Sequence, residues 1–384
     1  MKKQIIRAGI CIGKIFLNLI YFFIKLLPSK NKIVMLSRQS NSPSLDFQLI
    51  EREILKRNDK IEIEILCKKL KKDYFSRFKY CFYILKCMKQ IATAKVCILD
   101  GYSIPISLLK HKKHLEIIQI WHASGAIKKF GYQSLNKKEG RGKEIAKLMD
   151  MHKNYKHVMA PTKATAEFYK KAFNVKEDQI FINGLPRIDY ILETNKLNKK
   201  QKEFYKDYPQ YKNKRTILYV PTFRKNEDYS KYLKQLIKNV NRDKYNLIIK
   251  THPLDKKNKF NKYEINKKYN TFDLIVIADY IITDYSAVAF EASILNKPIY
   301  FYVFDIERYK SERGLNIDLL EEMKSCTYKS AREIINSIEE DNYNYDELLK
   351  FKNKYMGNPR NNNTKKLVDF IFNYLDEDVR NEKN

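Results

Sequence analysis

The distribution of short apolar runs constrains the fold of this 384-residue chain more than any other feature. From residue 33 onward, runs rich in Ile, Val and Leu alternate with amphipathic stretches of helix length. Continuous β-branched runs are typical of strands buried on both faces of a parallel sheet. The first set of predicted strands is IVMLS (33–37), IEIEILC (61–67), VCILD (96–100), LEIIQIW (115–121), HVMAP (157–161) and IFING (180–184).

A second set of predicted strands follows a basic stretch, residues 196–215, that has no strand pattern and is the best candidate for a linker. We therefore expect an α/β chain with two parallel-sheet domains, 30–195 and 216–384, the second ending in a polar helical tail. Two such domains imply a cleft between them, where ligands usually bind. The second set is TILYVPT (216–222), NLIIKTH (246–252), LIVI (274–277), YIITD (280–284) and IYFYV (299–303).

Residues 1–28 predict an amphipathic helix, and no acidic residue occurs before Asp46. Polar residues fall on one narrow stripe of this helix, while Ile, Leu and Phe make up the rest of its surface. This pattern is typical of a helix lying at an anionic membrane. The alternative is a helix packed on the protein's own domain, with the stripe facing water. The stripe consists of Arg7, Lys14, Asn18, Tyr21 and Lys25.

The charge balance favours polyanionic partners. The chain has 75 Lys and Arg against 45 Asp and Glu, a formal net charge of +30. Such a field attracts nucleic acid, an anionic membrane surface or a phosphate-rich substrate. The six cysteines form no CxxC pair, and no acidic residue accompanies His111, His114, His152 or His157 at ligand spacing. We therefore expect a reducing cytosolic environment, no metal site and no cofactor.

Two histidines directly follow predicted strands, where open α/β sheets present catalytic groups. His122 opens the loop of WHASGAIKKFG (121–131), and its pKa range suits a general base. Lys128 and Lys129 in the same motif could hold phosphate. His252 in IIKTHP (248–253) could donate a hydrogen bond to a phosphoryl oxygen. For both histidines the alternative is a purely structural role in a loop or turn.

The segment 277–302, IADYIITDYSAVAFEASILNKPIYFY, carries the strongest local signal. Its strand ends in a turn, and Ser286 is the predicted N-cap of a helix of small residues. Backbone N–H groups at that helix start would form an anion site, and Glu291 could reach a ribose. The alternative is an ordinary capped helix that binds nothing. The candidate residues are Thr283, Asp284, Tyr285, Ser286, Ala287 and Glu291.

Three further motifs supply candidate site residues. The sequence has no glycine-rich phosphate loop and only ten glycines. Phosphate would instead be held by helix termini, Arg and Lys. The motifs are VPTFR (220–224) with Arg224, NGLPRID (183–189) with Arg187, and RGLNID (313–318).

Taken in order, these motifs resemble the CDP-glycerol glycerophosphotransferase family of teichoic acid synthesis. The match covers roughly residues 30–325 and is carried by WHASGAIKKFG, NGLPRID, YVPTFR, KTHP, TDYSAVAFEA and NKPIYFY. The resemblance implies a GT-B-like fold of two Rossmann-type domains facing a cleft, with the nucleotide on the C-terminal domain. It also implies transfer of a polyol phosphate from a CDP-activated donor to an acceptor hydroxyl, with release of CMP.

The resemblance also implies roles for individual residues. His122 matches a general base and His252 a histidine near the donor phosphates, while Arg224 looks like a donor contact and Glu291 like a ribose ligand. The stretch from Thr283 to Ala287 matches a phosphate-binding turn, although Ala287 stands where the family often has a second serine. Acceptor or phosphate contacts are expected from Lys128, Lys129 and Arg187.

By its length the chain resembles the primase type, which adds the first glycerol phosphate to an undecaprenyl-diphosphate-linked saccharide at the cytoplasmic face of the cell membrane. The alternatives are a ribitol- or other polyol-phosphate transferase or polymerase for teichoic acid or capsule, and a sugar-nucleotide glycosyltransferase. A basic nucleic-acid-binding protein is a third class, but no nucleic-acid-binding motif is present and we expect no such partner. The sequence leaves the oligomeric state open, with a homo-oligomer among the options.

Overall fold

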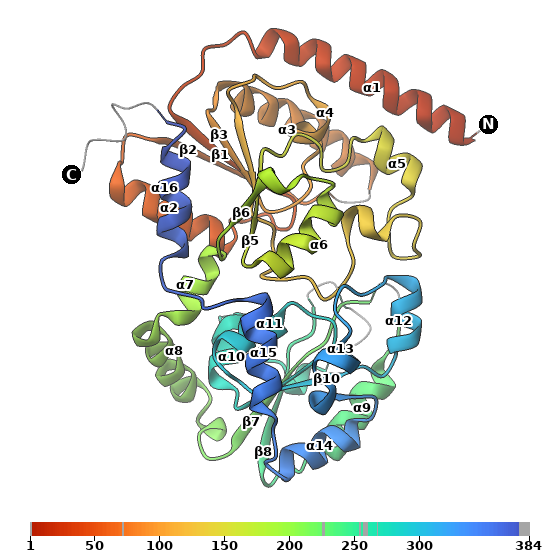
Figure 1. Cartoon of the computed structure of the whole chain (residues 1–384), viewed down its shortest axis with the longest axis vertical. Coiled ribbons are helices and arrows are strands. Elements are labelled where there is room, and N and C mark those ends of the chain that lie inside the picture. The colour runs from red at the N-terminus through yellow and green to blue at the C-terminus, as the bar shows by residue number, and fades with distance from the viewer. Residues whose placement is uncertain are drawn as a thin grey trace. The chain divides into compact units, whose positions relative to one another are not determined.

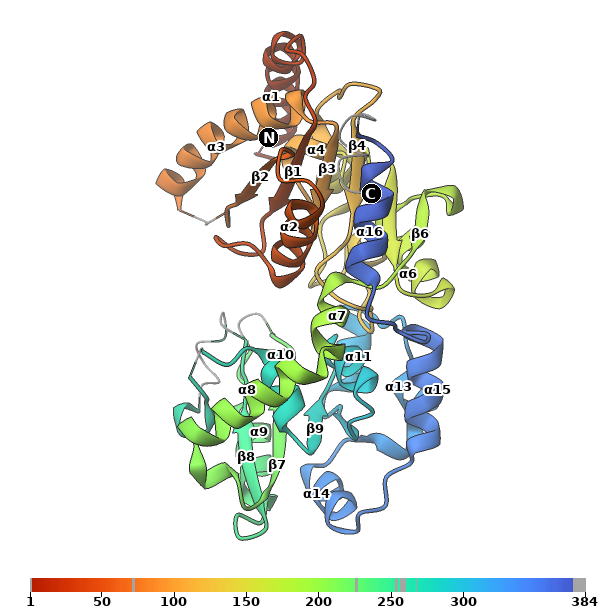
Figure 2. The ribbon, with the colours of Figure 1, turned by 90° about the vertical axis from the view of Figure 1, so that its left-hand side faces the viewer.

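The computed structural model describes residues 2–70, 73–224, 227–252, 255, 260–266 and 268–375. The chain forms two compact units, each with its own sheet (Figure 1 and Figure 2). The first unit contains Met1–Ala123, Phe130–Asp189 and Asn362–Asn384. The second contains Ser124–Lys129 and Tyr190–Asn361.

The first unit is built on a six-stranded sheet with the order β2-β1-β3-β4-β5-β6, and every neighbouring pair is parallel. All six residues of β1 are buried, as expected for a central strand covered on both faces. The six strands predicted for this half of the chain are thereby confirmed. They are β1 (Lys32–Ser37), β2 (Glu62–Cys67), β3 (Val96–Leu99), β4 (Glu116–Gln119), β5 (His157–Ala160) and β6 (Ile180–Ile182).

Helices cover this sheet, and α2 shows why they form where they do. The side chain of Ser44 accepts a hydrogen bond from the N–H of Phe47 and caps the helix, which then buries Phe47, Ile50 and Ile54. The helices of the first unit are α1 (Lys2–Ile24), α2 (Leu45–Arg57), α3 (Tyr74–Thr93), α4 (Ile104–Leu108), α5 (Lys143–Leu148), α6 (Lys163–Phe173) and α16 (Asn363–Phe372), and α7 (Pro186–Leu192) runs into the second unit.

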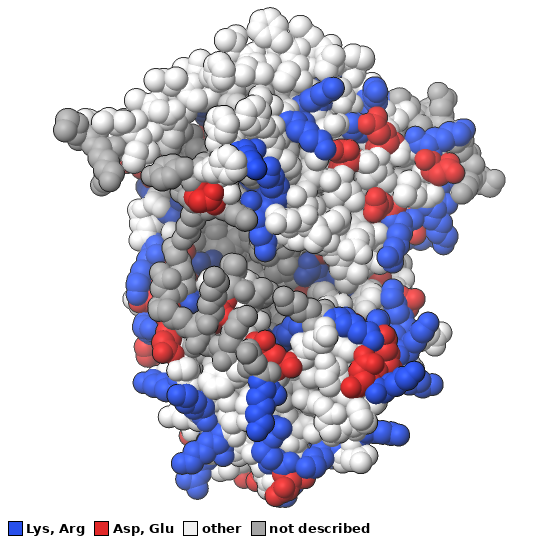
Figure 3. All heavy atoms as spheres, turned by 180° about the vertical axis from the view of Figure 1, so that it is seen from behind, with Lys and Arg blue, Asp and Glu red and all other residues white. Residues whose placement is uncertain are grey.

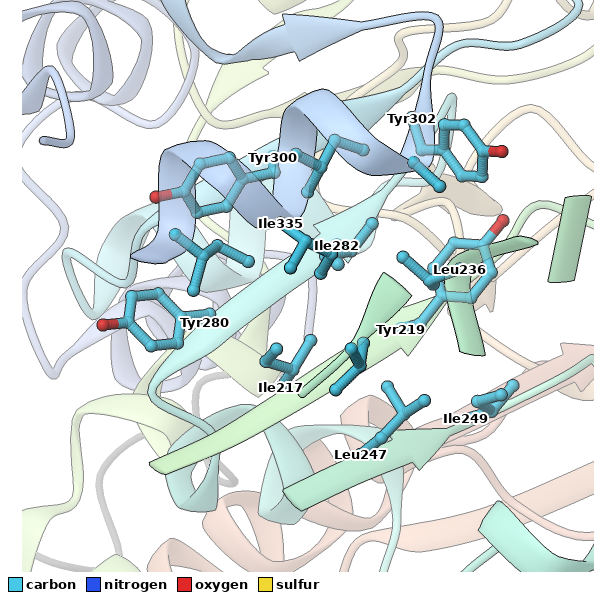
Figure 4. Packing of buried hydrophobic residues seen from close by; sticks show 14 of the residues in the cluster. Ile217, Tyr219, Leu236, Leu247, Ile249, Tyr280, Ile282, Tyr300, Tyr302 and Ile335 are labelled. Atoms are coloured by element: carbon cyan, nitrogen blue, oxygen red, sulfur yellow. The ribbon is translucent and has the colours of Figure 1, made fainter. Parts of the chain in front are cut away.

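The second unit has a five-stranded parallel sheet with the order β11-β10-β9-β7-β8. Side chains at alternate positions of four strands point to one face and meet α9 and α14, as for Ile217 and Tyr219 (Figure 4). The strands are β7 (Arg215–Val220), β8 (Tyr245–Ile249), β9 (Tyr280–Thr283), β10 (Ile299–Tyr302) and β11 (Thr327–Tyr328). The short strand β11 was not predicted.

The predicted strand LIVI (274–277) is wrong, because these residues belong to helix α10 (Thr271–Ile277). Asn270 accepts hydrogen bonds from the N–H groups of Phe272 and Asp273, and Asp273 in turn accepts one from the N–H of Asn270. This capping box starts a helix just before the apolar run. Four apolar residues in a row are too few to distinguish a buried strand from a buried helix.

The predicted linker 196–215 lies in the second unit and is largely helical. Most of it lies in helix α8 (Thr194–Asp207), which buries Leu197 and Phe204. The ring of Phe204 lies 5.2 Å from that of Tyr269 within the second unit. The remaining helices of this unit are α9 (Ser230–Asn239), α11 (Val288–Ile294), α12 (Ile306–Glu312), α13 (Leu319–Glu322), α14 (Ala331–Glu339) and α15 (Tyr345–Tyr355).

The division into units differs from the predicted domain boundaries at two further places. Helix α16, expected in the C-terminal domain, lies beside α2 in the first unit, where Leu367, Val368 and Ile371 share a buried cluster with Phe47. Conversely, residues 124–129 belong to the second unit although both neighbouring stretches belong to the first. Both exchanges depend on contacts between distant parts of the chain, which local patterns do not encode.

Helix α1 turns its polar stripe toward the first unit, so the alternative in which the stripe faces water is wrong. Lys14 pairs with Asp150, and Asn18 donates to the carbonyl of Leu108 and accepts from the N–H of Lys110. The exposed side of the helix is apolar, with Ile15 71% and Phe23 62% exposed. By length and composition Gln4–Ile24 could cross a membrane, and only 6% of its most apolar window is buried.

A histidine contact fastens the C-terminal half of α1. Nε2 of His111 lies 2.9 Å from the carbonyl oxygen of Ile106 and therefore carries a proton. Nδ1 is then the acceptor for the hydroxyl of Tyr21, at 3.0 Å. Burial, with a smaller effect of Lys25, lowers the pKa of His111 to about 4, so the ring is neutral at pH 7.

Candidate active site

In the first unit, the carboxyl ends of parallel strands β3 and β4 bring Asp100 and His122 together. Nδ1 of His122 lies 2.9 Å from the backbone carbonyl oxygen of Asp100. A carbonyl only accepts hydrogen bonds, so Nδ1 carries the proton in the neutral ring and Nε2 has a lone pair. This is the tautomer that a general base requires. The side chain of His122 is half-buried, as a group that must reach a substrate should be.

Trp121 fixes the orientation of His122. Its φ of 63° lies in the left-handed region, which costs a bulky residue about 1–3 kcal/mol. The indole stacks on Phe130 with ring centroids 4.6 Å apart, and its centroid lies 4.0 Å from that of His122. The N–H of Trp121 donates to Oε1 of Gln119 at 2.9 Å. These contacts compensate for the strained backbone and limit the freedom of the histidine ring.

Arg187, predicted to contact the acceptor or a phosphate, lies next to His122. Its guanidinium donates to both carboxylate oxygens of the fully buried Asp46, and its Nη1 donates to the carbonyl oxygen of His122 at 3.1 Å. Arg187 of the NGLPRID motif therefore stabilises the backbone of the loop that carries His122. A role of Arg187 toward substrate stays a prediction.

The sequence analysis missed the carboxyl group of Asp100. The residue is 1% exposed, and burial raises its pKa to about 6, with the nearby charge of Asp46 adding to the shift and Ser37 and Arg187 opposing it. A perturbed carboxyl beside a candidate base is typical of an active site. Its position directly after the buried run VCIL was the signal that could have identified it.

In the second unit, the loop 124–129 is anchored to helix α11. Oγ of Ser124 donates to Oε1 of Glu291 at 2.7 Å, and both residues are buried. Gly125 is required because a Cβ there would lie 2.6 Å from the ring of Phe290. The motif WHASGAIKKFG is thus divided: Trp121 and His122 belong to the first unit and the residues from Ser124 to Lys129 to the second.

The RGLNID motif holds the other end of this loop. The N–H of Lys129 donates to the carbonyl of Gly314 at 3.0 Å, and the amide of Asn316 donates to the carbonyl of Lys128 at 3.1 Å. Gly314 has a φ of +85°, which favours glycine. The RGLNID motif therefore holds the loop 124–129 in place. The side chains of Lys128 and Lys129 are half-buried, and their role in binding phosphate stays a prediction.

The predicted phosphate-binding turn after β9 is divided into a buried and an accessible part. Thr283, Asp284 and Tyr285 are fully buried, whereas Ser286 and Ala287 are half-buried. The N-cap of α11 is Ala287 rather than Ser286, because Ser286 accepts from the N–H of Val288 two residues on, at 3.4 Å, and the helix begins after that turn.

Arg224 lies in the interior of the second unit and not at its surface. Its side chain is 1% exposed and forms ion pairs with Asp284 at 2.8 Å and Asp305 at 2.7 Å. The guanidinium thus has two carboxylate partners, and the predicted role of Arg224 as a donor contact stays a prediction. Glu291, predicted as a ribose ligand, is also buried and bonded to Ser124, so its role toward a ribose remains a prediction.

Among the predicted site residues, His252 has an exposed side chain. It follows β8, its ring lies 5.1 Å from that of Phe223, and its carbonyl accepts from the N–H of Asp255 at 2.8 Å. Pro253 of the same motif lies outside the described residues. Because β7, β8 and β9 are parallel, the segments carrying Arg224, His252 and Ser286 leave the same edge of the sheet.

No group of three His, Cys, Asp or Glu side chains suited to a metal ion occurs within the described ranges. The polar groups at both carboxyl edges are instead suited to proton transfer and to binding of anions.

Comparison with known proteins identifies the class. Residues 19–373 match the family model of CDP-Glycerol:Poly(glycerophosphate) glycerophosphotransferase. A teichoic acid ribitol-phosphate primase of Bacillus spizizenii is 30% identical, with 91% of this chain and 93% of the relative covered. A teichoic acid glycerol-phosphate primase of Bacillus subtilis is 31% identical, with 79% and 80% covered. The chain belongs to this family, as its motifs suggested, and it is a transferase of teichoic acid biosynthesis.

The solved structures agree on the fold. A solved structure of the wall teichoic acid polymerase TagF has a TM-score of 0.73 and 18% identity, with 99% of this chain and 98% of the solved chain covered. A TagF variant soaked with CDPG has a TM-score of 0.71. The expectation of a GT-B-like α/β fold with two parallel sheets is therefore confirmed.

Proposed function

We propose that this enzyme is a primase that transfers glycerol phosphate from CDP-glycerol to a hydroxyl of an undecaprenyl-diphosphate-linked saccharide and releases CMP. The observation that carries the proposal is the contact between Nδ1 of His122 and the carbonyl of Asp100, at the carboxyl edge of the first sheet. In the neutral ring this contact puts the proton on Nδ1, so Nε2 is the nitrogen that we propose takes the proton of an acceptor hydroxyl.

The reaction forms one bond from the acceptor oxygen to the β-phosphorus of the donor and breaks the bond from that phosphorus to the oxygen of CMP. Nε2 of His122 removes the hydroxyl proton as the new bond forms. Negative charge on the phosphoryl oxygens requires donors, and His252, the N–H groups near Ser286 and the lysines 128 and 129 are the proposed ones.

The assignment as a primase is supported by relatives that match along most of both chains. By contrast, the chain covers 60% of a poly(ribitol-phosphate) polymerase of Bacillus spizizenii. A poly(glycerol phosphate) polymerase of the same organism is covered over 95% of its length, so length does not separate the two activities. The number of units added to each acceptor therefore decides between primase and polymerase.

Ribitol phosphate is a second candidate for the transferred group. The relative with 30% identity over 91% of this chain is a ribitol-phosphate primase, and the glycerol-phosphate primase is covered less fully. The chemistry at phosphorus would be the same for either polyol, and only the pocket around the polyol would differ.

We also propose attachment to the cytoplasmic face of an anionic membrane. Because the polar stripe of α1 is bonded to the first unit, the apolar side of the helix faces outward. On the face shown in Figure 3, the end of the unit that carries α1 has few charged side chains. Attachment at this surface would bring the enzyme to a lipid-linked acceptor.

Helix α3, which packs beside α1, extends this surface. Its outward residues Phe75, Phe78 and Phe82 are 66%, 61% and 59% exposed. They repeat at spacings of three and four, with exposed Lys79 between them and exposed Lys89 further along the same helix. Neither α1 nor α3 contains an acidic residue. An aromatic and basic face of this kind suits an anionic bilayer better than a protein partner.

The test is CMP release from CDP-glycerol and, in parallel, from CDP-ribitol, with a soluble analogue of the lipid-linked disaccharide as acceptor. Mass spectrometry of the product then counts the units added. One glycerol phosphate per acceptor is expected. A ladder of products would mean a polymerase, and CMP from CDP-ribitol alone would make the ribitol candidate correct. The proposal fails if the folded protein releases CMP from neither donor.

A further inference from the structure

A buried cluster of one arginine and two aspartates lies beneath the carboxyl edge of the second sheet. The guanidinium of Arg224 contacts Asp284 through Nη1 at 2.8 Å and Asp305 through Nε at 2.7 Å and Nη2 at 3.0 Å. The exposed fractions of the three side chains are 1%, 0% and 5%. Ions so deeply buried are costly unless each has its partners, so the arrangement is held in one geometry.

The cluster connects the segments that follow three neighbouring strands. Oδ1 of Asp284 accepts hydrogen bonds from the N–H groups of Thr222, at 2.8 Å, and Tyr285, at 2.7 Å. Nη1 of Arg224 also donates to the carbonyl oxygen of Thr222 at 3.0 Å. The loop after β7, the turn after β9 and the loop after β10 therefore share one set of bonds.

A fourth segment, the one that carries His252, is connected through Tyr229. The hydroxyl of Tyr229 donates to Asp255 at 2.5 Å, and the N–H of Asp255 donates to the carbonyl of His252 at 2.8 Å. The guanidinium carbon of Arg224 lies 5.3 Å from the ring centroid of Tyr229. Arg224 is thus connected both to the turn at Ser286 and to the segment that carries His252, and we propose that both contact the donor phosphates.

Aromatic rings enclose the cluster and strengthen its electrostatic bonds. Phe304 and Tyr309 lie 4.8 Å and 5.5 Å from the guanidinium carbon, and Tyr285 stacks on Tyr309 with centroids 4.0 Å apart. Burial by itself would raise the pKa of Asp305, but hydrogen bonds and charge from Arg224 hold this pKa below its ordinary value. Asp305 is therefore a charged partner of the arginine at pH 7.

We propose that Arg224 is a positioning residue that, through Asp284 and Asp305, sets the shape of the turn at Ser286 and Ala287 for binding of the donor's diphosphate. The proposal rests on the proposed function only in naming the donor as the ligand of this turn. Lysine cannot replace the arginine, because one ammonium group cannot hold both carboxylates in the planar geometry of a guanidinium.

The experiment compares the full-length enzyme with the variants Arg224→Lys and Asp305→Asn. We expect KM for the CDP-activated donor to rise about tenfold or more in each, with a smaller change in kcat, since turn geometry governs donor binding. In the double variant KM should rise by less than the product of the two single-variant factors, because both residues act through one cluster. Arg57→Lys is the matched control, because Arg57 pairs with Glu53 and Asp369 in the first unit.

Amide hydrogen exchange of residues 284–290, measured without any donor, separates this proposal from the proposed function. Faster exchange in Arg224→Lys, with the melting temperature little changed, would support positioning even if the donor were a different nucleotide. The proposal is overturned if the variant retains wild-type exchange in this segment, or if it loses melting temperature while KM for the donor stays the same. If Arg224→Lys does not fold, the milder Asp305→Asn decides by the same measurements.

Discussion

Nδ1 of His122 donates its proton to the backbone carbonyl of Asp100, 2.9 Å away. The partner is a main-chain atom, so this hydrogen bond depends on the course of the chain after β3. It orients the ring for its proposed role as a base.

Replacing His122 tests this arrangement directly. His122→Asn can still donate to the carbonyl of Asp100 but cannot accept a proton, so we expect kcat to fall about 10²–10⁴-fold with donor affinity nearly unchanged. Turnover and calorimetric binding of the donor are the measurements. His114→Asn is the control, because His114 precedes β4 at the opposite edge of the sheet. Activity that survives in His122→Asn would rule out the base.

Because the pKa of Asp100 is raised, replacing its carboxyl group should stabilise the folded protein by an amount that depends on pH. The pKa of this carboxyl is about 6 in the folded protein against 3.8 for the free group, chiefly because of burial. The folded state therefore loses stability as the pH rises through 6, by up to roughly 3 kcal/mol for a shift of this size. Asp100→Asn should raise the free energy of unfolding at pH 8 and change it little at pH 4.

Denaturant unfolding at the two pH values measures this effect. Because His122 is held by the main chain of Asp100, the variant should keep kcat within a few-fold. A loss of kcat beyond about a hundredfold would mean that the carboxyl itself takes part in proton transfer.

The bond between Ser124 and Glu291 should be costly to remove. Ser124→Ala takes one donor from a buried carboxylate, which we expect to destabilise the protein by about 1–3 kcal/mol. A double-mutant cycle with Glu291→Gln should give a coupling energy of about 0.5–3 kcal/mol. Ser293→Ala is the comparison, since Ser293 is buried on the same helix and its hydroxyl donates to the nearby carbonyl of Phe290. Equal losses for the two serine variants would contradict the prediction.

The outward faces of α1 and α3 should both be needed for membrane attachment. Replacing Phe75, Phe78 and Phe82 by Ser is expected to weaken binding to vesicles containing phosphatidylglycerol by about tenfold or more, given the apolar area removed. Turnover of soluble substrates should not change. The control replaces Tyr345 and Leu349, exposed apolar residues of α15 in the second unit. Sedimentation with vesicles is the measurement, and unchanged binding of the α3 variant would exclude α3 from the surface.

Local patterns predicted every strand of the two described sheets except β11, and they placed the candidate residues after the strands. Runs such as VCIL and YIIT are β-branched and continuous, so their burial in parallel strands could be predicted. Parallel strands end at one edge of a sheet, and this rule places His122, His252 and Ser286 at carboxyl edges. The short run LIVI was misassigned because four consecutive apolar residues show no period that would distinguish a buried helix from a buried strand.

The sequence by itself determined the α/β class, the family and the candidate base, because these depend on residues close together in the chain. Only the tertiary structure decided that Arg224 is a buried partner of Asp284, that Ser124 bonds to Glu291, and that α1 turns its polar stripe inward. Each of these is a contact between segments 60 to 167 residues apart or between whole elements. Periodicity reports which side of an element is polar, but packing against distant segments decides what that side meets.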